Sequence, residues 1–467
     1  MPICEHPCDG SWGYQVTGYF AATARYGTPQ DFMYFVDRMH QSGIGVLLDW
    51  VPAHFPRDEQ GLRLFDGTAC YEHEGPLEGE QPQWGTMLFN YGRGEVKSFP
   101  MSSAMFWLDQ YHIDGLRVDA VSCMLYRNYG KKDGEWVANK DGGAENYEAI
   151  DFLRRTSELI FRDKKGVIFA AEEASAFPLV THPTSEGGLG FNFKWNMGWM
   201  NDALHYQKMD PYFRQFNHRD LTFPLVYAFS ENFILPISHD EVVHMKGSML
   251  GKMPGDNEAK FAGVRAFYVY MMTMPGKKLN IMGTEIGQFN EWHYEYSLDW
   301  HLMEYPEHRK HQAYFKALNA LYLSRSELWE LDDSWDGFQW VEPDDATGNT
   351  LIYLRKDRKK NTLLIAVNFS PIDRKGYCIG VPTAGTYETL LNSDDEDFGG
   401  QGRGDHAPLK TKPIPCHGFD QSLQVDLPPL SGVILRCSRK NPVRKKKADA
   451  PAKGKRPAAK KKLAKHG

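Results

Sequence analysis

The chain has 467 residues, of which 42% are hydrophobic and 24% are charged, a balance typical of globular proteins with large cores. No apolar run approaches the roughly 18 residues of a membrane span and no signal-peptide pattern opens the chain, so we expect a cytoplasmic protein with no membrane partner. The formal net charge is −6, but residues 438–467 hold 13 of the 54 Lys and Arg and one of the 60 Asp and Glu. The rest of the chain is therefore acidic, which does not favour a nucleic-acid surface.

The first predicted helix begins near Thr28 and ends at Gly43. Thr28 can cap it, Pro29 suits its first turn, and Asp31 lies near the positive end of the helix dipole. From this helix to residue 337, short apolar runs alternate with amphipathic segments. We predict strands at 44–49, 86–90, 113–119, 167–172, 191–196, 232–238 and 279–283, and further helices at 96–111, 146–162 and 258–273.

This alternation is typical of repeated βα units, in which a parallel sheet is covered by helices on both faces. We therefore predict an α/β domain of the barrel type over residues 1–337. After residue 337 the chain changes to β-rich runs with no helices between them, at 350–354, 362–369, 386–391 and 430–437. These runs predict a small antiparallel all-β domain, a sandwich, over residues 338–437.

Residues 438–467 carry a net charge of +12 and consist mainly of Lys, Ala, Pro and Gly. Such a composition cannot bury a core, so we predict a disordered basic tail. Two interpretations of the tail stay open. It is either a solubilising extension or an electrostatic tether to an anionic partner that the sequence does not identify.

Four of the predicted strands end at or next to acidic residues. In chain order these residues are Asp49, Asp119, Glu172 and Asp240, with His54, Glu173 and His239 close by. All parallel strands of a closed barrel have their carboxyl ends on one face, where barrel enzymes place their chemistry. Clustered carboxylates repel one another, so a catalytic role explains them better than a structural one.

The residues of this cluster suit a glycosidic mechanism. Arg117 and Asp119 face the same side of a strand, and although such a pair is more often a structural ion pair, here it favours an ionised nucleophile. Glu172 follows an apolar run that should raise its pKa and keep it protonated as the acid, with Glu173 as its rival. A retaining mechanism needs two such carboxyl groups roughly 5–5.5 Å apart. Three further side chains are placed to bind sugar hydroxyls: His54, His239 and Asp240.

Residues 49–54, 115–119, 171–173 and 238–241 resemble the ordered signature regions of the α-amylase superfamily, and most closely those of the glycogen (1,4-α-glucan) branching enzymes. Further stretches of the branching type are Asp9–Gln15, Phe65–Thr68, Lys194–Trp199 and Ser297–His301. The resemblance covers residues 1 to about 437 and leaves the basic tail outside.

The resemblance implies cleavage of an α-1,4 link in a glucan and transfer of the excised chain to a 6-hydroxyl, which forms an α-1,6 branch in glycogen biosynthesis. It implies that Asp119 is the nucleophile, Glu172 the acid/base and Asp240 the transition-state stabiliser. Substrate-binding positions fall on Tyr14, Asp49, His54, Arg117 and His239. Aromatic platforms for an acceptor chain would favour transfer over hydrolysis; the candidates, each equally well explained as core, are Trp50, Trp84, Trp199, Trp292 and Trp300.

Two departures from the family pattern matter. Many amylases have a calcium-binding Asn where this chain has Ala53, so we expect no metal and no cofactor. By the family's register, Pro2 and Ile3 are the last residues of the second barrel strand, and the first strand is absent. We therefore expect a (β/α)8-type TIM barrel that lacks its first strand and most of its second, as part of a longer protein in which Met1 is internal.

Three functions stay open at this point. The first is a branching transglycosidase, the second is an α-glucan hydrolase or debranching enzyme, and the third is a catalytically inactive glucan-binding fragment. In each case we expect a monomer whose partner is an α-glucan such as glycogen or amylose, with no nucleic acid required.

Overall fold

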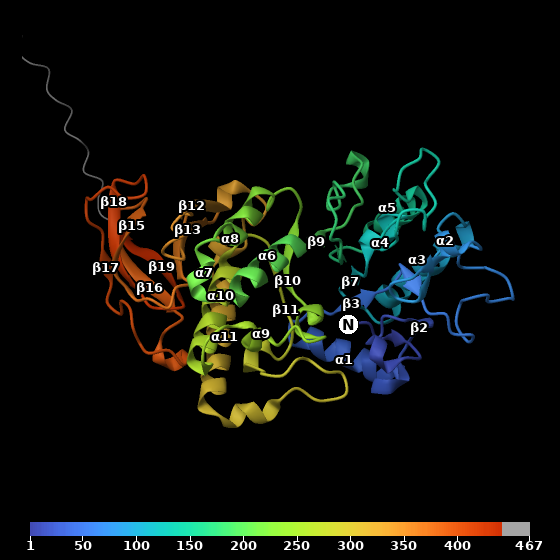
Figure 1. The fold of residues 1–467 in the computed structure, drawn as a ribbon, viewed down its shortest axis with the longest axis horizontal. Helices are drawn as coiled ribbons and strands as arrows, with labels where there is room; N and C mark the ends of the chain where they lie inside the picture. The colour runs from blue at the N-terminus through green and yellow to red at the C-terminus, as the bar shows by residue number, and fades with distance from the viewer. Residues whose placement is uncertain (441–467) are drawn as a thin grey trace, which may run out of the picture.

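The computed structural model describes residues 1–440 as two domains joined near residue 337, and the basic tail predicted from residue 438 lies outside the described residues from 441 onward. Figure 1 shows the α/β domain in the centre and on the right and the β-rich C-terminal domain on the left. No helix within the described residues is long and apolar enough to cross a membrane.

A six-stranded parallel sheet forms the centre of the α/β domain. Its strands, in the order in which they lie side by side, are β11 (Lys277–Asn280), β10 (Phe233–Ile237), β9 (Phe193–Trp195), β8 (Ile168–Ala171), β7 (Gly115–Val118) and β3 (Leu47–Trp50). Because every pair is parallel, all six carboxyl ends lie at one edge of the sheet. Within residues 1–440, β3 and β11 are the outer strands of this sheet.

Helices connect these strands and cover them, as Figure 1 shows. The longer ones are α1 (Pro29–Gln41), α3 (Gly94–Gln110), α5 (Tyr147–Asp163), α6 (Met197–Lys208), α10 (Asn257–Thr273) and α11 (Pro306–Ser324). The predicted start of the first helix is confirmed, since Thr28 and Asp31 form a reciprocal capping box at its N-terminus. Shorter helices are α2 (Pro76–Gly79), α4 (Val121–Leu125), α7 (Pro211–Arg214), α8 (Arg219–Thr222) and α9 (Met249–Lys252).

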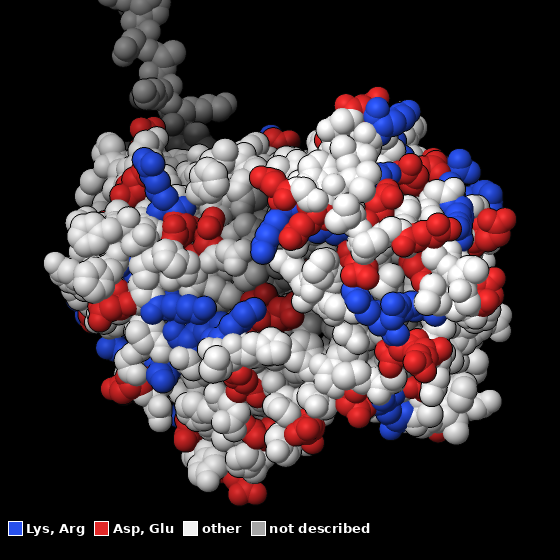
Figure 2. All heavy atoms as spheres, turned by 45° about the vertical axis from the view of Figure 1, so that its right-hand side comes forward, with Lys and Arg blue, Asp and Glu red and all other residues white. Residues whose placement is uncertain are grey.

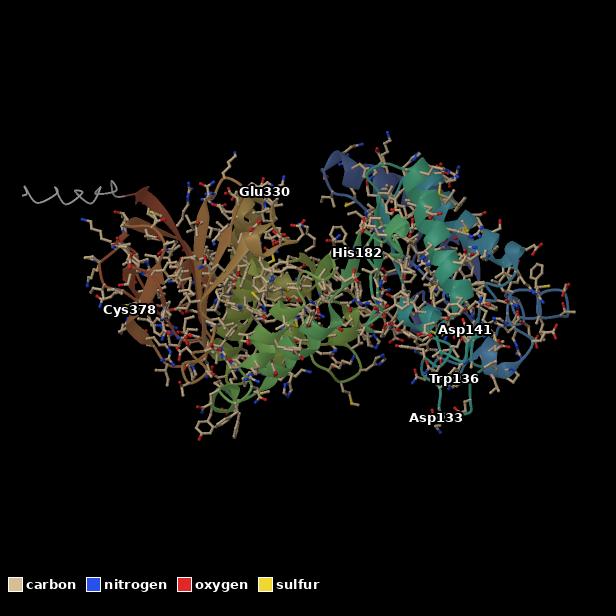
Figure 3. All side chains as sticks on the ribbon, turned by 90° about the horizontal axis from the view of Figure 1, so that it is seen from above. Asp133, Trp136, Asp141, His182, Glu330 and Cys378 are labelled. Atoms are coloured by element: carbon tan, nitrogen blue, oxygen red, sulfur yellow. The ribbon has the colours of Figure 1, made fainter. Side chains whose placement is uncertain are left out.

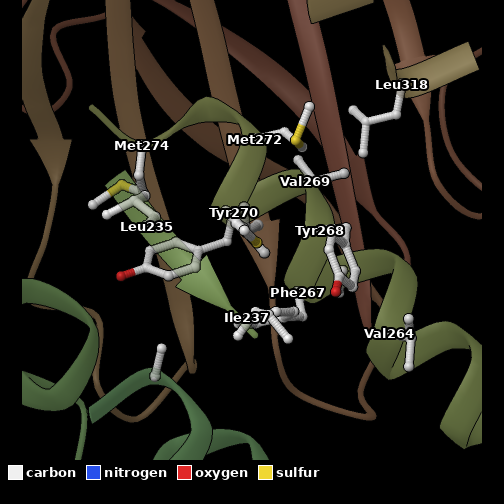
Figure 4. Close-up of a cluster of buried hydrophobic side chains, with 14 of the residues drawn as sticks. Leu235, Ile237, Val264, Phe267, Tyr268, Val269, Tyr270, Met272, Met274 and Leu318 are labelled. Atoms are coloured by element: carbon white, nitrogen blue, oxygen red, sulfur yellow. The ribbon is translucent and has the colours of Figure 1, made fainter. Parts of the chain in front are cut away.

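Helix α10 is buried on nearly all sides. Figure 4 shows its side chains packed against Leu235 and Ile237 of β10 on one side and near Leu318 of α11 on the other. Its far side meets the C-terminal domain, where a Cβ atom on Gly432 would come within 2.6 Å of Val269. This close approach requires glycine, and the shared core joins the two domains.

Three expectations about strands are corrected. Residues 86–90 were predicted within the βα series, but β6 (Thr86–Leu88) belongs to a separate antiparallel sheet with β4 (His54–Phe55) and β5 (Glu80–Gln81). The end strands are shifted, since β3 begins at Leu47 and β11 ends at Asn280. Pro2 and Ile3 lie outside the parallel sheet, next to β1 (Cys4–Glu5), which pairs antiparallel with β2 (Gly18–Ala22). Local apolar runs do not reveal which partner strand completes their hydrogen bonds.

The C-terminal domain is a pair of packed antiparallel sheets. One sheet contains β12 (Phe338–Glu342), β13 (Thr350–Lys356), β14 (Thr362–Asn368), β19 (Ser431–Lys440), β16 (Gly385–Asn392) and β17 (Leu409–Lys410), and the other contains β15 (Arg374–Val381) and β18 (Gln421–Leu427). A hydrophobic cluster that includes Ile379 and Leu435 lies between them. Arg355 ties this domain to α10, because its Nη1 donates a hydrogen bond of 2.6 Å to the carbonyl of Thr273.

The surface carries both signs of charge. On the face seen in Figure 2, Lys and Arg side chains are interspersed with Asp and Glu. Figure 3 shows Asp133, Trp136 and Asp141, from the long loop between α4 and α5, at the lower edge of the half of the molecule that lies away from Cys378 of β15. Six cysteines are free thiols: Cys4, Cys8, Cys70, Cys123, Cys378 and Cys416.

Candidate active site

A pocket of about 360 Å³ opens at the carboxyl ends of the parallel strands. Of the predicted site residues, six line it: Tyr14, His54, Asp119, Glu172, His239 and Asp240. Asp49 and Arg117 lie beneath them and contact the lining residues. The structure therefore brings together all eight side chains that the sequence singled out.

Arg117 is the centre of this arrangement. Its Nη1 donates a hydrogen bond of 2.9 Å to Oδ1 of Asp119, and its Nη2 donates one of 2.5 Å to Oε2 of Glu172. The strand register places Arg117 beside Asp49, whose Oδ2 lies 3.4 Å from the same Nη1. The guanidinium also lies 4.3 Å from the ring centroid of Trp195. One buried cation thus orients three carboxyl groups.

Asp119 follows directly on the end of β7, and its side chain is almost completely buried. Burial alone would raise the pKa of Asp119, but the charge of Arg117 and the neighbouring His54 ring hold that pKa below its usual value. His54 Nε2 lies 3.7 Å from the second carboxylate oxygen. Asp119 is therefore an ionised, oriented carboxylate at neutral pH.

Glu172 occupies the matching position after β8, and its Oε2 also accepts a hydrogen bond of 3.0 Å from the backbone N–H of Ala120. Burial raises the pKa of Glu172 to about 8, and the negative charge of Asp119 adds to this rise while Arg117 opposes it. At neutral pH this carboxyl group therefore retains its proton. Two neighbouring carboxyl groups with pKa values shifted in opposite directions are typical of an acid and base pair.

Glu173, the alternative candidate for the acid, points away from the pocket. Its side chain is fully buried and forms an ion pair of 2.5 Å with Lys194 of β9. It also accepts a hydrogen bond of 2.7 Å from the Ser122 hydroxyl of α4. Glu173 does not line the pocket, and its contacts tie the end of β8 to β9 and α4.

Asp240 and His239 come from the 3-10 turn His239–Val242 after β10. Ser238 begins this turn in a capping box with Glu241. His239 is buried, which lowers its pKa, and its Nε2 lies 3.5 Å from Asp240 Oδ1. The Asp240 side chain is 44% exposed, so it is the most accessible of the three acidic groups that line the pocket.

Tyr14 forms one wall of the pocket. Its hydroxyl donates a hydrogen bond of 2.6 Å to Asp49 Oδ2, and its ring stacks on that of His239 with the ring centroids 5.3 Å apart. Arg117 holds the pKa of Asp49 at about 2 although burial alone would raise it. Asp49 is thus a buried anion that orients Tyr14 and Arg117, and it does not line the pocket itself.

Several pocket residues were not predicted from the sequence. Trp12 lines the pocket and its ring stacks on His244 at 5.3 Å, while Tyr129 and Gln15 complete the wall. Trp12 and Gln15 fall within the stretch 9–15 that carried the family resemblance, which could have identified them. Nothing in the local sequence of Tyr129 indicates its place. Among residues 1–440, no cluster of three or more His, Cys, Asp or Glu side chains is arranged to hold a metal ion.

The candidate tryptophan platforms divide into two groups. Trp50 and Trp199 are buried in the two parts of the core, and Trp292 is 9% exposed. Trp84 is 36% exposed, lines the pocket and lies 5.0 Å from the ring of His54. Trp300 is 54% exposed and lies outside the pocket lining.

Comparisons with known proteins agree with this geometry. Residues 340–438 match the family described as the alpha amylase C-terminal all-beta domain. The chain is 54% identical over 435 residues to the 1,4-alpha-glucan branching enzyme GlgB of Aromatoleum aromaticum, with 93% of this chain and 68% of that protein covered. It is 52% identical over 437 residues to the 1,4-alpha-glucan branching enzyme GlgB of Rhodopirellula baltica, with 93% of this chain and 59% of that protein covered.

The chain therefore spans about three-fifths to two-thirds of the length of these curated relatives. Among solved structures, it is similar to the alpha-amylase of Geobacillus thermoleovorans complexed with acarbose, with a TM-score of 0.65, 14% sequence identity, and 95% of this chain and 87% of that chain covered. At that identity the likeness concerns the fold alone. The predicted fold class, a barrel-type α/β domain that lacks strands, followed by a small all-β domain, is confirmed.

Proposed function

Because this chain belongs to the family of 1,4-α-glucan branching enzymes, we propose that its pocket cleaves an α-1,4-glucosidic bond and transfers the glucan segment on the non-reducing side of that bond to a 6-hydroxyl. The observation that carries the proposal is the Arg117 guanidinium, which holds Asp119 and Glu172 side by side at the pocket while their pKa values are shifted in opposite directions. This is the arrangement that a retaining mechanism needs.

In the first step, the Asp119 carboxylate attacks the anomeric carbon of a glucose unit. Glu172 donates its proton to the glycosidic oxygen, so the C–O bond breaks and the leaving chain departs with a new hydroxyl group. The products are a glycosyl ester on Asp119 and a Glu172 carboxylate. The position of Arg117 between the two groups supports this assignment, because its positive charge stabilises the negative charge that Glu172 gains when it donates its proton.

In the second step, the 6-hydroxyl of an acceptor glucan attacks the ester. Glu172 removes the hydroxyl proton, the bond to Asp119 breaks, and an α-1,6 link forms with retention at the anomeric carbon. We assign Asp240, the most accessible carboxylate at the pocket, to the hydroxyls of the distorted sugar ring. His54 and His239 flank the same space and support that role as hydrogen-bond partners.

Transfer must outcompete hydrolysis, because water reaches any open pocket. Aromatic rings at the pocket mouth favour an acceptor chain, since sugar rings stack on them and displace water. Trp12 and Trp84 both line the pocket and are the rings that we assign to this task. We propose an α-glucan such as glycogen or amylose as the substrate, a monomer as the working form and the cytoplasm as the location. The free thiols, among them Cys4 and Cys123, support that location.

The test is to incubate the protein with linear amylose and follow two signals. Branching lowers the iodine colour with little gain in reducing ends, whereas hydrolysis raises the reducing ends in step with the loss of colour. Digestion of the product with a debranching enzyme should then release short linear chains. The variant Asp119→Asn is the matched control, since it preserves the shape of the site. Unchanged amylose with the unmodified protein would reject the proposed activity for this chain.

A further inference from the structure

Residues 239–247, which we call the β10 loop, carry Asp240 and turn back toward the pocket. Within the loop, His244 and Met245 adopt the left-handed backbone conformation, with φ of 55° and 64°. Side chains with a Cβ atom disfavour this conformation and keep it only where surrounding contacts hold it. This backbone conformation places the ring of His244 at the pocket mouth, where it stacks on Trp12.

Lys252 of α9 provides one set of these contacts. Its side chain is buried, and its ammonium group donates hydrogen bonds to the backbone carbonyls of Glu241, Lys246 and Gly247. An ammonium group has three donors, so all of them are used on this one loop. Lys252 itself lies outside the pocket lining.

Glu291 provides the complementary set. One carboxylate oxygen accepts a hydrogen bond of 3.0 Å from the N–H of Met245, and the other accepts one of 2.6 Å from the N–H of Gly247. The Lys252 ammonium group therefore binds carbonyl oxygens of the loop, and the Glu291 carboxylate binds N–H groups of the same loop. The loop's own backbone hydrogen bond runs from the N–H of Lys246 to the carbonyl of Val243. Lys252 and Glu291 together satisfy further backbone groups of the loop that would otherwise need other partners.

We infer that Lys252 and Glu291 are positioning residues that hold the β10 loop in its strained shape, so that Asp240 and His244 face the pocket. This inference rests on the proposed function in one respect, namely that the pocket is the site of glucan chemistry. The loop's shape is a property of the fold, so it can be measured without any turnover.

The first experiment measures amide hydrogen exchange in the full chain and in the variants Lys252→Met and Glu291→Gln. Both variants should increase exchange at residues 239–247 and leave the centre of α10 unchanged. Lys278→Met is the matched control, because Lys278 also donates to two backbone carbonyls, those of Met274 and Gly276, but lies on β11. Should Lys252→Met fail to fold, Glu291→Gln, whose parent side chain is only half-buried, decides the question.

The second experiment measures kcat and KM for the branching of amylose. Displacement of Asp240 by about 1 Å should lower kcat by about 100-fold in either loop variant, with a smaller change in KM. Lys278→Met should lower the thermal midpoint but keep kcat. Any of three results would overturn the inference. The loop variants could show unchanged exchange at residues 239–247, the Lys278→Met control could show an equal increase there, or the loop variants could keep kcat within about twofold of the unmodified value. If the unmodified protein does not branch amylose, the proposed function fails, and the exchange data still decide whether these residues hold the loop.

Discussion

Glu173 and Lys194 form a buried ion pair of 2.5 Å directly behind the pocket-facing Glu172. Lys194 also donates a hydrogen bond of 2.9 Å to the carbonyl of Ser175, and Ser122 donates to Glu173. The two consecutive glutamates at the end of β8 therefore have opposite surroundings, one in the pocket and one in a closed network. This difference leads to the first two predictions.

The variants Glu172→Gln and Glu173→Gln should differ strongly in activity. Glu172→Gln removes the proton donor and should lower kcat on amylose by several orders of magnitude. Glu173→Gln keeps the pocket side chains and should have a much milder effect. Steady-state kinetics on both variants make the comparison, and the reverse ranking would transfer the acid role to Glu173.

Lys194→Met should destabilise the fold. The change leaves the Glu173 carboxylate buried without a cation, which costs about 3–5 kcal/mol in the free energy of unfolding. Urea unfolding followed by circular dichroism measures the change. The double variant Glu173→Gln/Lys194→Met serves as the control, because it removes both charges and should regain most of the lost stability; equal destabilisation in both would argue against the ion pair as the cause.

Asp119→Asn should abolish turnover while the fold stays intact. The amide preserves the shape of the side chain but cannot attack the anomeric carbon, so kcat should fall by several orders of magnitude. The thermal midpoint and the circular dichroism spectrum report on the fold. Near-normal turnover in this variant would remove Asp119 from the mechanism.

The activity should depend on pH through Glu172. Because the pKa of Glu172 is raised to about 8, the group holds its proton at neutral pH and loses it as the pH rises through that value. We expect kcat/KM on amylose to fall about tenfold for each pH unit above 8. The acid limb should lie below pH 3.8, because Arg117 and His54 hold the pKa of Asp119 under that value.

A glucosyl fluoride substrate provides the control for this profile. Fluoride departs without a proton, so the alkaline limb should weaken or vanish if Glu172 is the acid. A spectrum recorded at pH 9 excludes unfolding as the cause. An alkaline limb of equal steepness with both substrates would contradict the assignment.

Two tryptophans should respond differently to truncation. Trp84→Ala removes a half-exposed ring at the pocket, so KM for amylose should rise about fivefold, the equivalent of about 1 kcal/mol of lost stacking. Trp199→Ala removes a buried ring that packs on Tyr270 and should cost about 3–5 kcal/mol in the free energy of unfolding. Kinetics and urea unfolding of both variants test the distinction. A large loss of stability in Trp84→Ala would show that Trp84 is a core residue rather than a substrate platform.

Much of this protein could be predicted from local sequence. Helix caps such as Thr28 with Asp31, apolar strands, and acids at strand ends are set by side-chain chemistry within a few residues. They predicted the fold class and seven of the eight side chains that meet at the pocket, whereas Tyr14 was implied only by the family resemblance. Arg117 and Asp119 are two residues apart in one strand, so their contact is also local.

Only the tertiary structure decided which of those groups face the same space. In the structure, Glu172 faces the pocket and Glu173 faces Lys194. Residues 86–88 belong to a separate antiparallel sheet. Trp12 packs against His244, although the two residues are far apart in the sequence of the α/β domain. The physical reason is that a pocket wall and a strand's partner are set by packing between segments far apart in the chain, whereas propensity and spacing describe only neighbours along it.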